Sequence, residues 1–308
     1  MRALAAYLMR GRIQAIFVTA TCAVLALLLP PLSYLSGAGV ALVTLRLGSR
    51  EGVLVMLGAG LALGLLAFAA LGNPSPGIAY VLVIGLPLGL LGWILRSTQS
   101  LALTLSAAAG MGMLTVVGVH IFTSDTASWW LEILNAVVRP ALEQAGARND
   151  AQQINELLIK LSQVLTGLMA AAMMLSLVIS LLIGRWWQGM LYNPGGFRQE
   201  FHGLHISRVL TLPLLGVLAV SVLDKGLAGQ IAAELLVVLL VLYMIQGLAL
   251  AHRMAARFHA HVAWLIALYA LLFVALPKVA IVLAAAGFAA TWLNFQVPLK
   301  ALDDKKQD

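Results

Sequence analysis

Residues 185–207 read RWWQGMLYNPGGFRQEFHGLHIS and form the one long polar stretch that has no good apolar stripe at helical spacing, in a chain that is apolar nearly everywhere else. At its centre is the turn signal Asn193-Pro194-Gly195-Gly196, where proline fixes one φ angle and the two glycines allow unusual ones. Aromatic residues flank this turn on both sides. We therefore expect a shaped loop that joins two groups of membrane helices.

The rest of the composition is that of a membrane protein. Of 308 residues, 62% are hydrophobic and 10% are charged, against about 25% charged in an ordinary soluble domain. Several apolar runs reach the roughly 17–25 residues that cross a bilayer as a helix. Glycine and proline fall largely within or beside these runs. The pattern predicts an all-α integral membrane bundle and not a barrel, whose strands would alternate polar and apolar residues.

The apolar runs predict about ten transmembrane helices. They cover residues 13–29, 32–47, 52–71, 78–95, 101–122, a sixth run ending near 183, and 209–223, 229–251, 262–276 and 279–297. Between the fifth and sixth runs, residues 123–160 carry charges of both signs and apolar positions at helical spacing, which predicts an outward interfacial helical excursion. We expect its second half to project from the bilayer and to continue unbroken into the sixth span.

These runs suggest three regions. Residues 1–183 would form a six-span unit that includes the outward excursion 123–160, residues 184–208 a cytoplasmic loop, and residues 209–308 four further spans with a solvated tail.

The distribution of basic residues predicts the orientation. With a cytoplasmic start, all but five of the 19 lysines and arginines fall on the cytoplasmic side. The five exceptions are Arg139, Arg148, Lys160, Lys225 and Lys278. The excess of positive charge on cytoplasmic loops then places both termini and the loop 184–208 in the cytoplasm. Because the charges are dispersed between spans, they do not indicate nucleic-acid binding.

The chain carries no motif of an ATPase, zinc protease, serine hydrolase or dithiol enzyme, so we expect a protein that is not an enzyme and has no cofactor. Cys22 is the only cysteine, which excludes an intrachain disulfide. Five histidines (202, 205, 252, 259 and 261) lie on the predicted cytoplasmic side, but no cysteine or carboxylate stands at ligand spacing, and we expect no metal site.

Small residues recur four apart in three predicted spans. They indicate close helix packing, or alternatively a glycine-lined cavity. The pairs are Gly60 with Gly64, Gly85 with Gly89, and Ser106 with Gly110. In the fourth span, Pro87 is expected to break the helix. The tryptophan pairs 129–130 and 186–187 suggest anchors in the headgroup layer.

Glu234 is the only acidic residue well inside a predicted span. A carboxylate in that position is a candidate for ion coupling or ligand binding, and the alternative is a structural pair with Lys278 or Lys225. In the same span, Gln246 suggests a hydrogen bond between helices.

The loop supplies the other candidate site, with two interpretations. Either it docks a protein partner, or it is a rigid cap in which Glu200 pairs with Arg198 or Arg208 and the turn returns Phe197 and Phe201 against the helix ends. The candidate residues are Asn193, Gly195, Gly196, Phe197, Arg198 and Glu200.

The motif NPGGF, followed by EF and Leu204, resembles the YybS-like family of bacterial membrane proteins. That family is distantly similar to the S-components of energy-coupling-factor transporters, six-helix proteins that bind vitamins or metal ions and dock on a coupling subunit. The resemblance implies a bacterial cytoplasmic-membrane location and a transporter-like fold, with the spans through Ile183 as the matching unit. The AxxxA-like docking surface of S-components has only Ala15, Thr19 and Ala23 as an equivalent here. No site residue carries over.

Two function classes follow. The first is a transporter-like protein that binds a small hydrophobic or ionic solute within the lipid bilayer, and Glu234 favours it. The second is a membrane scaffold that does not transport and anchors cytoplasmic or envelope partners, which the loop favours.

Overall fold

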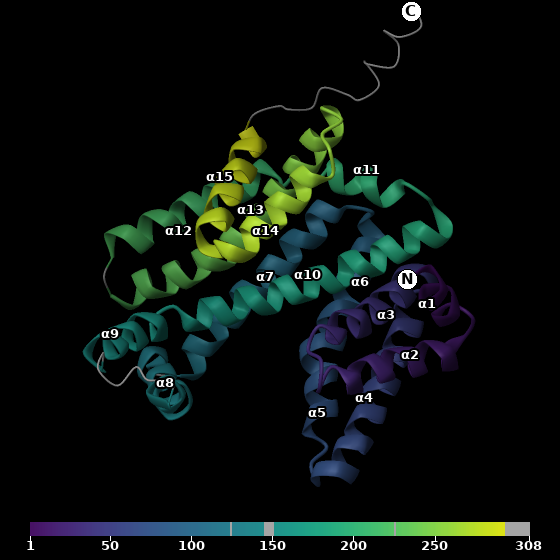
Figure 1. Ribbon diagram of the computed structural model, residues 1–308, viewed down its shortest axis with the longest axis horizontal. Helices are drawn as coiled ribbons and strands as arrows, with labels where there is room; N and C mark the ends of the chain where they lie inside the picture. The colour runs from purple at the N-terminus through teal and green to yellow at the C-terminus, as the bar shows by residue number, and fades with distance from the viewer. Residues whose placement is uncertain (124, 145–150, 225, 293–308) are drawn as a thin grey trace, which may run out of the picture. The chain divides into compact units, whose positions relative to one another are not determined.

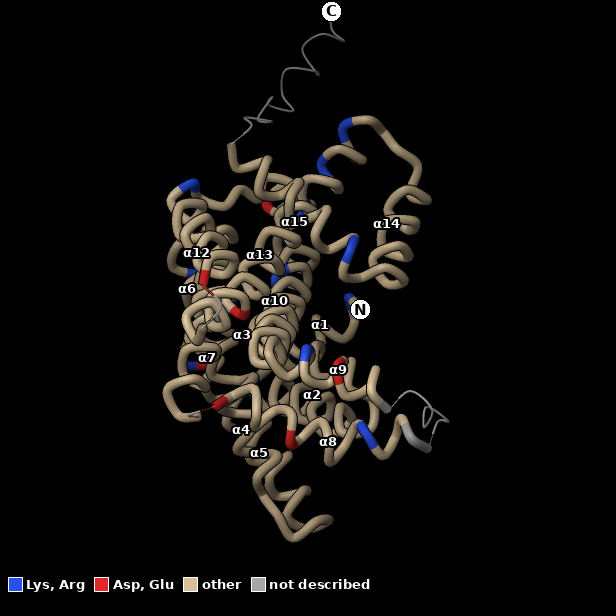
Figure 2. Tube along the Cα trace, turned by 90° about the vertical axis from the view of Figure 1, so that its left-hand side faces the viewer, with Lys and Arg blue, Asp and Glu red and all other residues tan. Residues whose placement is uncertain are grey.

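The computed structural model describes residues 1–123, 125–144, 151–224 and 226–292, and these form helices without any strand. The predicted all-α class is therefore confirmed for this part of the chain. Lys225, Arg148 and the charged tail lie outside the described residues. In Figure 2 the helices are tan along most of their length, because charged residues are few.

Five helices in the described ranges are long and apolar enough to cross a membrane. They are Ser49–Leu71, Ser75–Thr98, Leu101–Phe122, Leu165–Tyr192 and Leu227–Arg257. Shorter apolar helices lie where the first, second, seventh, ninth and tenth spans are predicted. They are Arg12–Leu25, Leu32–Leu47, Arg208–Leu223, Ala263–Val274 and Leu276–Trp292. A count of about ten membrane spans stays a prediction.

Contacts divide the chain into two compact units. Unit 1 is Met1–Ala108 with Leu175–Leu204, and unit 2 is Ala109–Met174 with His205–Asp308. The border between them falls inside two continuous helices, α7 (Leu101–Phe122) and α10 (Leu165–Tyr192). The regional boundaries at residues 183 and 208 stay a prediction.

Unit 1 is built around α3. The helices that lie wholly in this unit (Figure 1) are α1 (Arg2–Leu8), α2 (Arg12–Leu25), α3 (Leu32–Leu47), α4 (Ser49–Leu71), α5 (Ser75–Ala79), α6 (Leu86–Thr98) and α11 (Gly196–His202). Ser36 to Leu45 are all buried, and α2, α4 and α6 pack against this helix. Gly37 of α3 lets α6 and α10 approach closely, since a Cβ there would lie 2.6 Å from the side chain of Leu88 and 2.8 Å from that of Ser180.

Glycines also join α4 to α5, as predicted for Gly60 and Gly64. A Cβ on Gly77 of α5 would lie 2.6 Å from the Cα of Gly64. A groove of about 430 Å³ runs along the same crossing, so close packing and a glycine-lined groove occur together. The packing prediction is wrong for Gly89 and Gly110, where an added Cβ would meet nothing within 4 Å.

The fourth predicted span changes its winding before Pro87 and does not break. Residues Tyr80–Gly85 form a π-helical turn between α5 and α6. Proline has no backbone N–H, so the carbonyl four residues before it loses its usual donor. A single π-helical turn relieves this mismatch without ending the helix.

Unit 2 is organised on α13 (Leu227–Arg257), its longest helix. Besides its parts of α7 and α10, unit 2 contains α8 (Thr126–Gln144), α9 (Ala151–Ser162), a 3₁₀ turn (Arg208–Leu210), α12 (Thr211–Leu223), α14 (Ala263–Val274) and α15 (Leu276–Trp292). Helix α15 lies directly on α13 (Figure 1), where a Cβ on Gly247 would clash with the carbonyl of Leu283. Gln246 donates to Gly287 O at 2.7 Å and accepts from Ile206 N at 2.9 Å, which confirms its predicted role between helices.

The excursion differs from its prediction in one respect. Helix α9 ends at Ser162 and α10 begins at Leu165, so the helix does not run unbroken into the span. Helix α9 folds back on α8 because its apolar face, with Ile154 and Leu158, shares a small core with Leu134. Burying that face outweighs the continuity of one long helix.

Candidate functional site

Glu234 lies about two turns inside α13 and its side chain is 0% exposed. Its Oε2 is 2.8 Å from Nε2 of His120, which stands near the end of α7 and is 6% exposed in its side chain. The predicted pairing of Glu234 with Lys278 is therefore wrong, and the alternative partner Lys225 lies outside the described residues. The pair joins two apolar helices that are 114 positions apart in sequence.

Glycines on two helices bring this site together. A Cβ on Gly167 of α10 would lie 2.6 Å from the Cα of Glu234, so α10 touches the backbone of α13 at the carboxylate itself. One turn further on, a Cβ on Gly112 of α7 would lie 2.9 Å from Val238. Close approach of three helices leaves no exposed path to Glu234 and holds its side chain between them.

The first turn of α8 closes the site. Thr126 Oγ1 lies 3.4 Å from Nδ1 of His120 and accepts a hydrogen bond of 3.3 Å from Nε2 of Gln230 on α13. Trp130, one turn later, donates its indole N–H to Thr166 Oγ1 of α10 at 2.9 Å. Three helices of unit 2 thus hold the start of α8 over the buried pair. Trp130 is half-buried and helps to hold α8 in place, and its role as a headgroup anchor stays a prediction.

Asp125 fixes that first turn of α8. Its carboxylate accepts from the backbone N–H of Ser128 at 3.0 Å and from the Ser128 hydroxyl at 2.5 Å. This is how an aspartate caps a helix N-terminus. The hydrogen bonds from Ser128 hold the pKa of Asp125 below its ordinary value, so the cap persists as a carboxylate at neutral pH.

The carboxylate of Glu234 is incompletely satisfied. Oε2 faces His120, but Oε1 has no hydrogen-bond partner, although Gln230 and Thr166 are close to the group. A buried charged oxygen without a donor is costly, by about 1–3 kcal/mol or more. The free acceptor is therefore a place where a ligand's hydrogen-bond donor would be stabilised.

The sequence prediction found Glu234 and missed its surroundings. His120, Thr126, Thr166 and Gln230 belong to four different helices, and nothing in their spacing shows that they meet. One signal was present: His120 is an ionisable residue inside an apolar run, which is a reason to suspect function. Among the described residues, no group of three or more His, Cys, Asp or Glu side chains could hold a metal ion.

The second candidate region, the predicted loop, is mostly helical. Helix α10 continues through Tyr192, because nothing breaks it before Asn193-Pro194. A tight turn follows, with Gly195 at φ +88°, and α11 begins at Gly196. The left-handed conformation confirms the prediction for Gly195. At Gly196 the requirement is space instead, since a Cβ there would clash with the side chain of Asn193.

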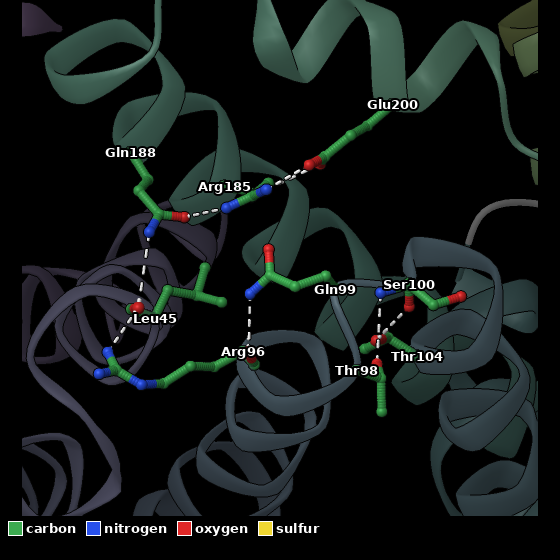
Figure 3. A network of polar contacts seen from close by, with 9 residues as sticks. All are labelled: Leu45, Arg96, Thr98, Gln99, Ser100, Thr104, Arg185, Gln188 and Glu200. Atoms are coloured by element: carbon green, nitrogen blue, oxygen red, sulfur yellow. Dashed lines mark hydrogen bonds and ion pairs between the residues drawn. The ribbon is translucent and has the colours of Figure 1, made fainter.

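Arg185 ties α11 to the end of α10 (Figure 3). Its guanidinium donates from Nε to Oε2 of Glu200 at 2.8 Å and from Nη2 to Oε1 of the same carboxylate, while Nη1 donates to Oε1 of Gln188. The prediction that Glu200 pairs with Arg198 or Arg208 is therefore wrong, because Glu200 pairs with Arg185. Leu45 O of α3 accepts from Arg96 at 2.8 Å and from Gln188 at 3.5 Å, so the ends of α3, α6 and α10 share this polar network.

The aromatic residues of this region divide between core and surface. Phe197 stacks on Phe201 at 6.0 Å between ring centroids and lies against Gly189 of α10, as expected for a turn that returns to the helix end. Trp187 is fully buried, which corrects its prediction as a membrane anchor, whereas Trp186 is 40% exposed. Arg198 is exposed beside them.

No curated protein and no solved structure matches the chain. A family model described as a predicted membrane protein, DUF2232, matches residues 16–289. That range includes both the His120–Glu234 pair and the turn at Gly195. Because the match covers most of the 308 residues and the helices are those of a polytopic membrane protein, the chain belongs to the DUF2232 family of predicted membrane proteins.

Proposed function

We propose that this protein is a transporter-like, non-enzymatic binding protein for a small hydrophobic or ionic solute in the bacterial cytoplasmic membrane. The observation that carries the proposal is the buried His120–Glu234 pair with its unpartnered Oε1. An ionisable pair between membrane helices is costly, and such groups mark ion or substrate pathways more often than they stabilise a fold. The apolar groove between α4 and α5 offers room for a hydrophobic solute.

The experiment is native mass spectrometry of the protein released from lipid nanodiscs. The wild type should retain a bound small molecule, and Glu234→Gln should reduce its occupancy by about tenfold or more, which corresponds to about 1.4 kcal/mol. Glu156→Gln is the matched control, because Glu156 is an exposed carboxylate on α9. Equal occupancy in Glu234→Gln and the wild type would make the carboxylate a structural group.

The finer parts of the proposal come from the sequence. They are ten spans, cytoplasmic termini, membership of the YybS-like group, and a likeness of the first six spans to S-components. The positive charge on alternate loops supports the orientation. The NPGGF motif at Asn193 to Phe197 supports the group.

A scaffold remains the second candidate, and one observation favours it. Arg198 is exposed on α11, a short helix whose position is fixed by the Arg185–Glu200 pair and not by a flexible loop. A rigid, exposed cation suits docking of an acidic protein segment. Arg198→Ala should then abolish recovery of a co-purifying partner while leaving solute occupancy unchanged, and unchanged recovery would remove Arg198 from any docking surface.

A further inference from the structure

His120 uses both ring nitrogens, which makes its hydrogen bonds depend on its charge. Nε2 faces Glu234 at 2.8 Å and Nδ1 faces Thr126 at 3.4 Å. A neutral imidazole donates from one nitrogen and accepts at the other, whereas an imidazolium donates from both. With Nε2–H given to the carboxylate, Nδ1 of the neutral ring must accept from the Thr126 hydroxyl.

We propose that the ion exchanged at this site is a proton held by the His120–Glu234 pair, and that Thr126 transmits its binding to α8. The inference rests on the proposed function of the site, and it names the ion that the site takes up and releases. Without the proton, the pair consists of a neutral imidazole and a carboxylate, with net charge −1. A proton from water adds to Nδ1 of His120 and makes the pair neutral overall, and release returns the same proton to water.

The burial of the site supports this exchange. Both side chains are almost fully enclosed, and a net charge in such surroundings is far more costly than a neutral ion pair. In the described part of the chain, Thr126 of α8, Thr166 of α10 and Gln230 of α13 lie around the pair, and His120 of α7 is the titratable partner of Glu234. The enclosed pair therefore favours the bound proton, and opening to water favours its release.

The chemistry of the neighbours suits a proton better than a metal cation. Hard cations take about six or more oxygen ligands. Here the carboxylate is surrounded by an imidazole nitrogen, a side-chain amide and hydroxyl groups. His120 Nε2 faces one carboxylate oxygen at hydrogen-bond distance, which is a geometry suited to a proton held by the pair.

Thr126 responds to proton binding because its hydroxyl must change from a hydrogen-bond donor to an acceptor toward Nδ1 of His120. When His120 is neutral, the hydroxyl donates to Nδ1 and accepts from Gln230. When His120 is charged, Thr126 Oγ1 must accept from both Nδ1 and Gln230, and its own hydrogen turns elsewhere. Thr126 is the first residue of α8. Proton binding therefore changes the contacts that hold the α8 start over the site.

The test is nitrogen NMR of the full-length protein in nanodiscs with ¹⁵N-labelled histidine. The His120 signal is assigned by its loss in His120→Gln, and the protein is titrated between about pH 5 and pH 9. We expect His120 to show one protonated nitrogen in one state and two in the other, and Glu234→Gln to alter this behaviour because the partner of Nε2 has lost its negative charge. Replacing sodium chloride by potassium chloride, or either salt by one with a large organic cation at the same ionic strength, should leave the signal unchanged.

A second measurement follows α8 by hydrogen–deuterium exchange of the peptide that contains Thr126. Its exchange should differ between the two charge states of His120 in the wild type, should lose this difference in Thr126→Val, and should regain it in Thr126→Ser. A His120 signal that does not titrate, a shift caused by sodium, or an unaltered difference in Thr126→Val would overturn the inference. If His120 titrates but no solute is ever retained, the proposed function fails alone. If solute binds without titration, only the proton assignment fails.

Discussion

Arg185 illustrates how one side chain determines the shape of a helix junction. Its guanidinium is 17% exposed and the Glu200 carboxylate 29% exposed, so the pair is shielded from water at the end of α10. Paired nitrogen and oxygen atoms give such an interaction direction as well as energy. The pair fixes α11 after the turn at Gly195, where the backbone alone would permit many paths.

We expect Glu200→Ala to destabilise the protein by about 1–3 kcal/mol, because it leaves a shielded guanidinium without its anion. The measurement is thermal unfolding in detergent, in which the fraction of protein that stays monodisperse is recorded at each temperature. Arg198→Ala is the matched control, since Arg198 is two positions away and exposed. Equal losses in the two variants would show that the Arg185–Glu200 pair contributes nothing specific.

Single residues show which parts of the two candidate sites can be predicted from the sequence. A carboxylate in an apolar run was recognisable at Glu234, and a turn was recognisable at Asn193-Pro194-Gly195. The partners were not, because His120 and Arg185 are chosen by how helices pack and not by sequence spacing. Arg198 and Arg208 are close to Glu200 in sequence, yet Arg185 binds it, since α11 folds back along α10.

At the scale of helices, glycines set which surfaces can meet. Gly167 lets α10 touch α13 at Glu234, and Gly112 does the same for α7 at Val238. The periodicity of apolar residues predicts that such segments are helices, and small residues predict that some lie close together. These two sequence patterns could not predict that α9 would end at Ser162 or that α10 would extend to Tyr192, because every residue there is compatible with a helix.

We expect Gly167→Ala to disrupt the site around Glu234. The added methyl would lie 2.6 Å from the Glu234 Cα, and overpacking of this kind costs about 1–3 kcal/mol. Lower thermal stability and weaker solute retention should appear together. Gly118→Ala on α7 is the control, because an added Cβ there meets nothing within 4 Å. A Gly167→Ala protein as stable as the control would contradict the close contact.

For the whole molecule, the two ends of its helices should face different compartments. The polar network of Arg96, Arg185 and Glu200 lies at helix ends that the charge distribution assigns to the cytoplasm. The α8–α9 hairpin belongs to the opposite side in the same scheme.

Cysteine labelling tests this orientation in a Cys22→Ser background. Gln199 and Gln153 are both exposed, on α11 and α9. In intact cells, a reagent that does not cross membranes should label Gln153→Cys and leave Gln199→Cys unlabelled until the membrane is permeabilised. The reverse pattern would invert the topology, and labelling of both sites from outside would contradict the arrangement of spans.

The division of α7 and α10 between two units imposes an order on biosynthesis. The ribosome completes residues 109–174 of unit 2 before it makes residues 175–204, the last part of unit 1. Until then the face of α3 at Ala41 lacks Gly184 of α10, which later packs there. At about 5–20 residues per second, the wait between Ala41 and Gly184 lasts on the order of ten seconds. During this time lipid or the insertion machinery must cover that face of α3, so a premature stop at residues 109–174 would leave unit 1 without the part of α10 that completes it.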